Sequence, residues 1–155
     1  MKAGRSSDDE ILQIHGYHDE AMNHYFLAIE KRGGDQWLRK YQLDEEALKI
    51  YKIQEIRIDG DEVTSVDIDD RYVALGYGYF DRSKGKIEVR RLDSLERVHD
   101  LVGNSANYNI GLNVQIVSEK LQPGNHEVHY VYYNSVRRAS SRLNRFYIGQ
   151  LAIIH

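Results

Sequence analysis

The sequence predicts a mainly β protein, an antiparallel β-sandwich of about seven strands preceded by two N-terminal α-helices. Three observations lead to this prediction. Apolar residues recur every three or four positions in the first fifty residues, and they alternate with a period of two from about Ile53 onward. Turn residues separate the alternating runs at short intervals. We therefore expect a helical N-terminal segment at 1–52 and a β-sandwich domain at 53–155.

The composition is that of a folded, globular chain. Of the 155 residues, 41% are hydrophobic and 29% are charged, which permits a sizeable core. Cysteine is absent, so disulfides, thiolate nucleophiles and Cys-rich zinc sites are excluded. The formal net charge of −3 argues against a nucleic-acid binder that relies on a general basic excess.

Two sequence features bear on the expected localisation. The start MKAGRSSDDE lacks the apolar segment of a signal peptide, and no apolar run approaches the ~20 residues of a transmembrane span. The expected localisation is therefore cytoplasmic.

Two N-terminal stretches have helical spacing. Within 8–32, apolar or amphipathic residues recur three or four positions apart, as on one face of a helix. Gly33–Gly34 follows as a signal for the end of this helix. The second helix is expected at 45–52, with Asp44 as its N-cap. The members of the first apolar stripe are Ile11, Ile14, Tyr17, Ala21, Tyr25 and Ala28.

From Ile53 the expected elements are strands. The runs 53–58 and 63–68 flank an Asp-Gly turn and predict a hairpin. Residues 71–80 alternate bulky and small side chains, which suits a strand with another layer close against one face. Further strands are predicted at 87–93 and 145–155, and two more within 113–133, with a mixed strand and long loop at 94–109 and a polar loop at 134–144.

One segment resembles a known family. Residues 121–131, Leu-Gln-Pro-Gly-Asn-His-Glu-Val-His-Tyr-Val, resemble the corner between two late strands of fibronectin-type-III and other immunoglobulin-like bacterial modules. The family often has an aromatic residue where this chain has His126. The resemblance covers Leu112 to Tyr133 and implies an immunoglobulin-like sandwich of the kind attached to bacterial surface-glycan enzymes and exporters. It does not imply a particular ligand.

Tyrosine is over-represented, with 12 Tyr against 3 Phe. A tyrosine ring has an apolar body and a polar tip, which suits a half-exposed binding face. We therefore predict a face that stacks on sugars or packs against a protein, and ordinary cross-strand aromatic pairing is the alternative. Its predicted ligand-binding tyrosines are Tyr77, Tyr79, Tyr130 and Tyr132.

The densest positive charge lies in the predicted loop 134–144. Guanidinium groups match phosphate and carboxylate geometry, so Arg137, Arg138 and Arg142 are predicted to bind an anionic partner. A solvated loop that balances the acidic turns is the alternative.

No metal, cofactor or catalytic residue is predicted. His15, His18 and Asp19 would share a helix face, but no further ligand pattern accompanies them. The acidic residues from Asp59 to Asp70 lack the order of an EF-hand loop, so they are interpreted as turn and surface residues. The sequence also lacks a nucleophile elbow and a phosphate-binding loop.

The first functional hypothesis is a non-catalytic binding module that recognises a glycan or a protein partner through its Tyr-rich sheet face. The second is a structural protein that forms a homo-oligomer through its sheet. The third is a small hydrolase or metal-dependent enzyme that uses the His and Asp residues.

Overall fold

The computed structural model describes residues 10–59, 62–78, 85–104, 109–121, 126–140 and 143–153, and only the backbone of 121, 126, 137–140 and 143–145. The regular elements in these ranges are eleven β-strands in three antiparallel sheets. The chain divides into two compact units, Met1–Glu62 and Val63–His155, and each is described by itself. Within the described ranges there is no helix with the length and apolar character needed to cross a membrane.

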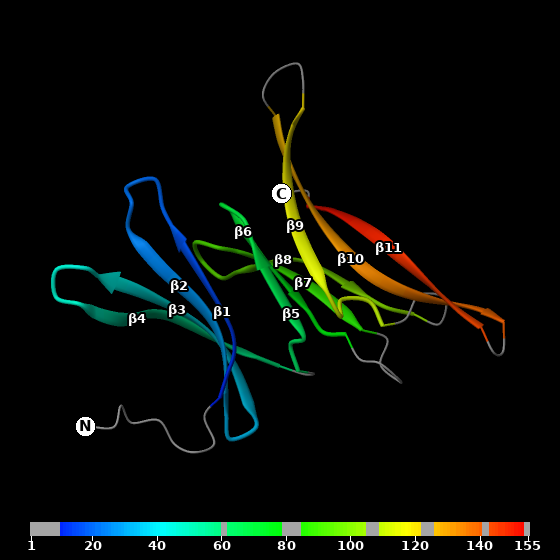
Figure 1. The fold of residues 1–155 in the computed structure, drawn as a ribbon, viewed down its shortest axis with the longest axis horizontal. Helices are drawn as coiled ribbons and strands as arrows, with labels where there is room; N and C mark the ends of the chain where they lie inside the picture. Colours follow the sequence, from blue (N-terminus) through cyan, green and yellow to red (C-terminus); the bar gives the residue numbers. More distant parts are fainter. Residues whose placement is uncertain are drawn as a thin grey trace. The chain divides into compact units, whose positions relative to one another are not determined.

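The first unit is a four-stranded antiparallel meander in which each strand pairs with its neighbour in sequence (Figure 1). Its strands are β1 (Glu10–His18), β2 (His24–Arg32), β3 (Asp35–Asp44) and β4 (Lys49–Ile58). One face of this sheet is buried. In β2 and β3, Leu27 and Ile29 lie opposite Lys40 and Leu38, and all four side chains are at most 5% exposed.

The prediction of two N-terminal α-helices followed by about seven strands is wrong, because the described ranges contain eleven strands and no helix. Residues 8–32 contain β1 and β2, and residues 45–52 form a turn and the start of β4. Segment 8–32 has so many apolar residues that they fit both the helical spacing of three or four and the period of two expected of a strand. Burial of one sheet face then decides the structure, because isolated helices of this length are marginal. The predicted antiparallel β character of the protein is confirmed.

Signals that suggested helix ends belong to hairpin turns. Gly33 and Gly34 connect β2 to β3 with φ of 56° and 91°, a conformation that favours glycine. Asp44 accepts a hydrogen bond from the Ala47 backbone N–H at 3.1 Å, as an N-cap would, but it closes the turn between β3 and β4. The predicted domain boundary after residue 52 falls inside β4, whereas the compact units divide after Glu62.

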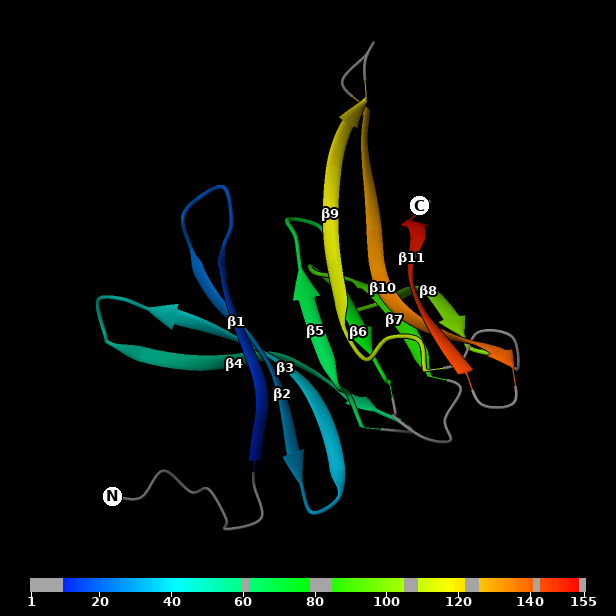
Figure 2. The same ribbon diagram turned by 45° about the vertical axis from the view of Figure 1, so that its right-hand side comes forward.

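The second unit contains two sheets, seen from two directions in Figures 1 and 2. The four-stranded sheet is a meander of β5 (Ser65–Ile68), β6 (Tyr72–Gly76), β7 (Lys86–Arg91) and β8 (Arg97–Val102). The three-stranded sheet has the order β11–β10–β9, with β9 at Val114–Leu121, β10 at His126–Ser140 and β11 at Leu143–Ile153.

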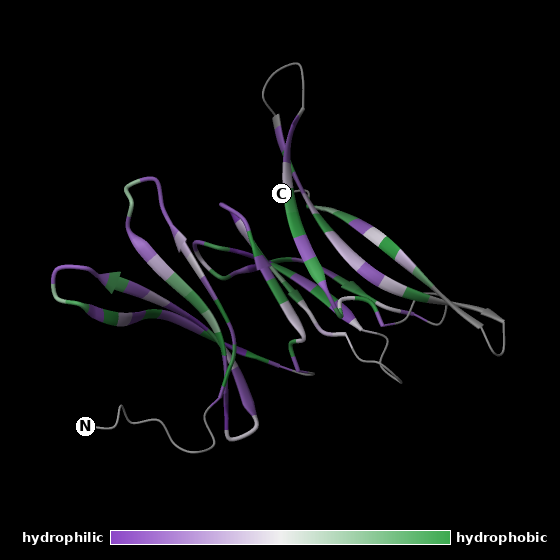
Figure 3. Cartoon of the chain, in the orientation of Figure 1, coloured by the Kyte–Doolittle hydropathy of each residue, from purple (hydrophilic) through white to green (hydrophobic). Residues whose placement is uncertain are grey.

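Both sheets of the second unit contribute to one hydrophobic core. The alternation of apolar and polar residues that produces it is visible as green and purple bands along β9, β10 and β11 (Figure 3). The core residues are Tyr72, Ala74, Ile87, Val89, Ile110, Ile116, Val131 and Ile153.

The predicted close layer beside residues 71–80 is confirmed. A Cβ atom added to Gly76 would lie 2.0 Å from the Gly111 carbonyl oxygen, and one added to Gly78 would lie 2.2 Å from the Leu112 backbone nitrogen. The Thr64 hydroxyl joins these segments, since it accepts a hydrogen bond from the Gly78 N–H at 2.9 Å and lies 3.1 Å from the Gly111 carbonyl oxygen.

Two predicted connections in the second half of the chain are wrong. Residues 53–58 and 63–68 do not form a hairpin, because β4 pairs with β3 and β5 pairs with β6. The stretch 134–144 is not a long loop, because β10 continues to Ser140 and β11 begins at Leu143. The expected proline-containing corner at 122–125 lies outside the described residues.

Candidate binding surface on the three-stranded sheet

Strand β10 presents different side chains on its two faces. His129 and Val131 are buried at 4% and 0% exposure, whereas Tyr130 and Tyr132 point to the opposite face and are partly exposed. The Tyr132 hydroxyl accepts a hydrogen bond from the side-chain amide of Gln150 at 2.9 Å, so β11 presents Gln150 on the same face.

Apolar side chains extend this face across the sheet. The register places Val117 opposite Tyr130, and Ile148 of β11 lies on the same side as Tyr132. Phe146 and Ile148 are 78% and 83% exposed, and Val117 is 39% exposed. We call this surface the outer sheet face; its residues are Val117, Tyr130, Tyr132, Phe146 and Ile148.

The structure brings together only some of the predicted ligand-binding residues. Tyr130 and Tyr132 lie on the outer sheet face, whereas Tyr77 is 1% exposed and lies in the interior. Arg137 and Arg138 lie in β10, opposite Arg145 and Asn144, and only their backbone is described. Tyr79 and Arg142 lie outside the described residues.

Sequence reasoning missed Phe146 and Ile148. The signal was present, because residues 146–153 alternate as a strand and every second residue from Phe146 lies on one side.

Tyr77 belongs to a buried polar network in the four-stranded sheet. Its hydroxyl donates to Glu88 at 3.3 Å, and Glu88, 4% exposed, also pairs with Arg90 and lies 3.7 Å from the Lys86 ammonium. The Lys86 nitrogen lies 4.2 Å from the centre of the Tyr77 ring. Burial, followed by the charge of Glu88, raises the pKa of Tyr77 far above its usual value. This network compensates a buried carboxylate and leaves Tyr77 as a structural residue.

An Asp–His pair links the two sheets of the second unit. The His129 Nδ1 pairs with Asp69, whose other carboxylate oxygen accepts the backbone N–H groups of Arg71 and Tyr72 at 2.8 and 2.7 Å. The His129 ring also packs edge-on against Tyr72, with ring centres 5.0 Å apart. Both oxygens of Asp69 are therefore engaged in holding the turn between β5 and β6 against β10.

Among the described residues, the same pair belongs to a cluster with potential metal-ligand atoms. Potential ligand atoms of Asp69, Asp70 and His129 lie within 4.8 Å of one another. The His129 Nε2 is buried and has no hydrogen-bond partner among the described residues, and Glu127 lies 3.9 Å away. No described hydroxyl is thus in position to be activated by this imidazole, as nucleophilic catalysis would require.

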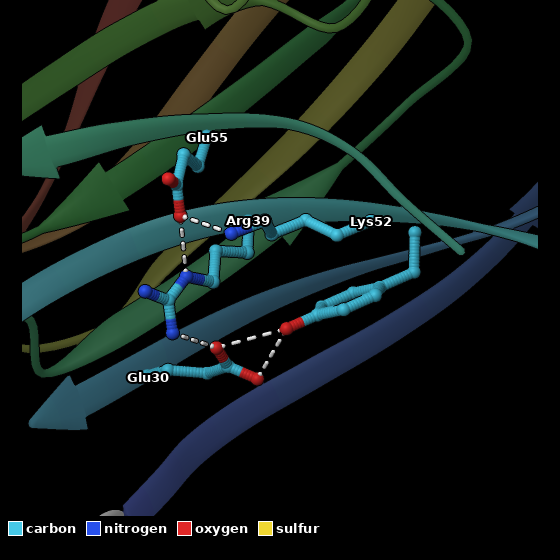
Figure 4. A network of polar contacts seen from close by, with 5 residues as sticks. Glu30, Arg39, Lys52 and Glu55 are labelled. Carbon is cyan, nitrogen blue, oxygen red and sulfur yellow. Dashed lines mark hydrogen bonds and ion pairs between the residues drawn. The ribbon is translucent and has the colours of Figure 1, made fainter. Parts of the chain in front are cut away.

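A charged network spans β2, β3 and β4 of the first unit (Figure 4). Arg39 donates to Glu30 at 2.7 Å and to Glu55 at 2.8 Å, and Lys52 donates to Glu55 at 3.1 Å. Tyr41 donates to Glu30 at 2.8 Å. Burial and this hydrogen bond raise the pKa of Tyr41 to about 12, and the hydrogen bonds from Arg39 and Lys52 lower the pKa of Glu55. Every charge in the network is paired with an opposite charge. The network therefore links β2, β3 and β4, and it leaves no unpaired charge of its own to bind a ligand.

The first unit also has an open depression of about 380 Å³ at one end of its sheet. It is lined by Met22, Tyr51 and the acidic turn at Asp44–Glu46, and His24 forms an ion pair with Glu45 at 3.1 Å. This ion pair occupies part of the acidic lining.

Comparison with known proteins adds no further assignment, since neither a protein-family model nor a curated protein sequence matches the chain.

Proposed function

We propose that the protein is a non-catalytic binding module that docks a protein partner on the outer sheet face. The observation that carries this proposal is the exposure of Phe146 and Ile148, 78% and 83%, beside two partly exposed tyrosines. Soluble proteins rarely expose large apolar side chains together unless another surface covers them. Tyrosine and phenylalanine are also enriched in protein interfaces.

The chemistry of the face favours a protein over a glycan. A glycan would use the tyrosine rings for stacking and the nearby Gln150 amide for hydrogen bonds, but it would leave the aliphatic Ile148 and Val117 uncovered. A protein segment with apolar side chains would cover all five residues. The partner that fits best is therefore an apolar segment in extended conformation, which can also hydrogen-bond to the strand at the sheet edge.

The test is to measure binding after truncation of the face. Tyr130→Ala and Tyr132→Ala should each weaken partner retention in a pull-down about tenfold or more, because interface tyrosines are frequent hot spots. The matched control is Tyr51→Ala, since Tyr51 is 48% exposed on β4 in the other unit. A glycan array with the same three variants measures the sugar alternative.

The outcomes separate the candidates. A protein retained by the wild type and the Tyr51 variant but lost from both face variants supports the proposal. Partner binding that survives both face substitutions contradicts it. Glycan binding that depends on Tyr130 and Tyr132, with no protein retained, would replace the protein partner by a sugar.

A further inference from the structure

In the part of the chain that the structure describes, the three sheets have six edge strands, which are β1, β4, β5, β8, β9 and β11. The outer side of an edge strand presents backbone N–H and C=O groups without a strand to pair with, and it can therefore recruit another chain. Natural proteins prevent this with charged residues, proline, bulges or very short edge strands.

Five of the six edge strands carry such protection. Strand β5 has only four residues, and β1 begins at Glu10 and has a register irregularity between Ile11 and Gln13. The other three carry charged residues along their length. These are Lys49, Lys52, Glu55 and Arg57 in β4, Arg97 and Asp100 in β8, and Glu119 and Lys120 in β9.

Strand β11 lacks these devices over eight consecutive residues. The segment Phe146–Ile153 contains no charged residue and no proline, and its pairing with β10 is regular throughout. It is the outermost strand of its sheet (Figure 1), and among the described strands only β10 packs extensively against it. Its exposed Phe146 and Ile148 project to the outer sheet face.

We propose that β11 pairs antiparallel with β11 of a second copy of this chain, so that the two three-stranded sheets become one continuous sheet. This inference rests on the proposed function and names a second copy of this chain as the partner, which meets the outer sheet face along its β11 edge, where Phe146 and Ile148 lie. A two-fold axis makes an antiparallel strand its own complement, because each residue of one copy meets a residue of the same strand in the other. The segment is uncharged, so the pairing brings no like charges together.

The side chains of β11, like its backbone, favour pairing with a second copy. In the paired sheet, Phe146 and Ile148 of one copy lie on the same face as their counterparts, and aromatic and β-branched residues are favourable cross-strand neighbours. The outer sheet faces of both copies then form one apolar surface with the tyrosines on its two sides.

The test uses charge at the edge. Light scattering over a concentration series should give the wild type a mass approaching twice 18.1 kDa. Ile148→Lys and Ile148→Glu should each remain monomeric, because two like charges meet across the axis. Ile148 is 83% exposed, so either substitution should leave the fold intact, which circular dichroism verifies. An equimolar mixture of the two variants should regain the dimer mass, a result that misfolding could not produce.

The matched control is Val102→Lys, which adds the same charge at an exposed apolar residue of β8, an edge strand of the other sheet in the same unit. It should leave the dimer intact. A dimer lost from this variant as well would show that the position of the charge on β11 does not matter and would overturn the edge pairing. A wild type that stays monomeric at every concentration would also overturn it.

A second measurement reports the register. Because the chain has no cysteine, single cysteines introduced at Phe146, Ile148 or Gln150 have no competing thiol. At least one should form an intermolecular disulfide under mild oxidation, since cross-strand positions near the axis bring Cα atoms within disulfide range. If none cross-links, the antiparallel pairing is wrong. A monomeric wild type that still loses a different protein on Tyr130→Ala would leave the proposed function standing without this inference.

Discussion

At the scale of single residues, the tightest constraint is the approach of one backbone segment to two glycines of the 71–80 stretch. Gly76 faces the Gly111 carbonyl oxygen and the Ser65 hydroxyl, which would lie 2.0 and 2.4 Å from an added Cβ. Both neighbours are tied into the structure, since the Ser65 hydroxyl donates to the same carbonyl at 3.2 Å. The contact therefore cannot relax by rotation of a free side chain.

We expect Gly76→Ala to lower the free energy of unfolding by about 3 kcal/mol, because the extra methyl forces backbone movement in a packed region. Chemical denaturation measures the change. Gly16→Ala is the control, since its Cβ would meet the Phe26 ring at 3.7 Å and the Tyr25 carbonyl oxygen at 4.0 Å, both ordinary contacts, and alanine is preferred over glycine in a strand. Equal stability of the two variants would contradict the close packing inferred at Gly76.

At the scale of elements, the charged network on β2, β3 and β4 has one member that matters more than the others. The Arg39 and Glu30 side chains are 16% and 17% exposed, whereas Lys52 is 46% exposed. Arg39 bridges Glu30 and Glu55 and so connects all three strands. Partial burial makes an unpaired charge costly, while an exposed ion pair contributes little.

Arg39→Met should therefore lower the free energy of unfolding by about 2 kcal/mol, because it removes the charge-assisted hydrogen bond to the partly buried Glu30 and leaves this carboxylate the hydrogen bond from Tyr41. Lys52→Met removes the other contact to Glu55 and should cost less than about 1 kcal/mol. Thermal or chemical unfolding of the pair measures the difference. If the Lys52 variant were as destabilised as the Arg39 variant, solvent exposure would not determine how much these ion pairs contribute to the free energy of unfolding.

At the scale of the whole molecule, the sequence could predict strands but not which strands pair. Period-two alternation identified the strands of the second half, and the glycines at 76 and 78 predicted a close layer. The predicted hairpin at 53–68 is wrong because its two strands pair with other strands, and tertiary contacts determine that pairing. The N-terminal helices failed because dense apolar residues satisfy both periods, and burial of one sheet face selects the strand.

For the candidate site, the sequence predicts which residues of one strand share a face, but not which residues of other strands lie beside them. Tyr130 and Tyr132 could be assigned to one face of a strand by parity alone. Their neighbours Phe146 and Ile148 come from β11, and no local sequence pattern shows its register with β10. The Asp69–His129 pair joins residues 60 positions apart, and no local pattern connects them.

The meander topology has a consequence for how quickly the chain folds. Every strand pairs only with its neighbours in sequence, so each pairing closes a short loop. Proteins dominated by such local contacts have low contact order and fold faster than those built on distant strand pairs. Refolding followed by stopped-flow fluorescence of Trp37 and the tyrosines should thus fall at the fast end of the all-β range, on the order of milliseconds. Refolding over many seconds would instead point to the joining of the two sheets around the Val131 core as the slow step.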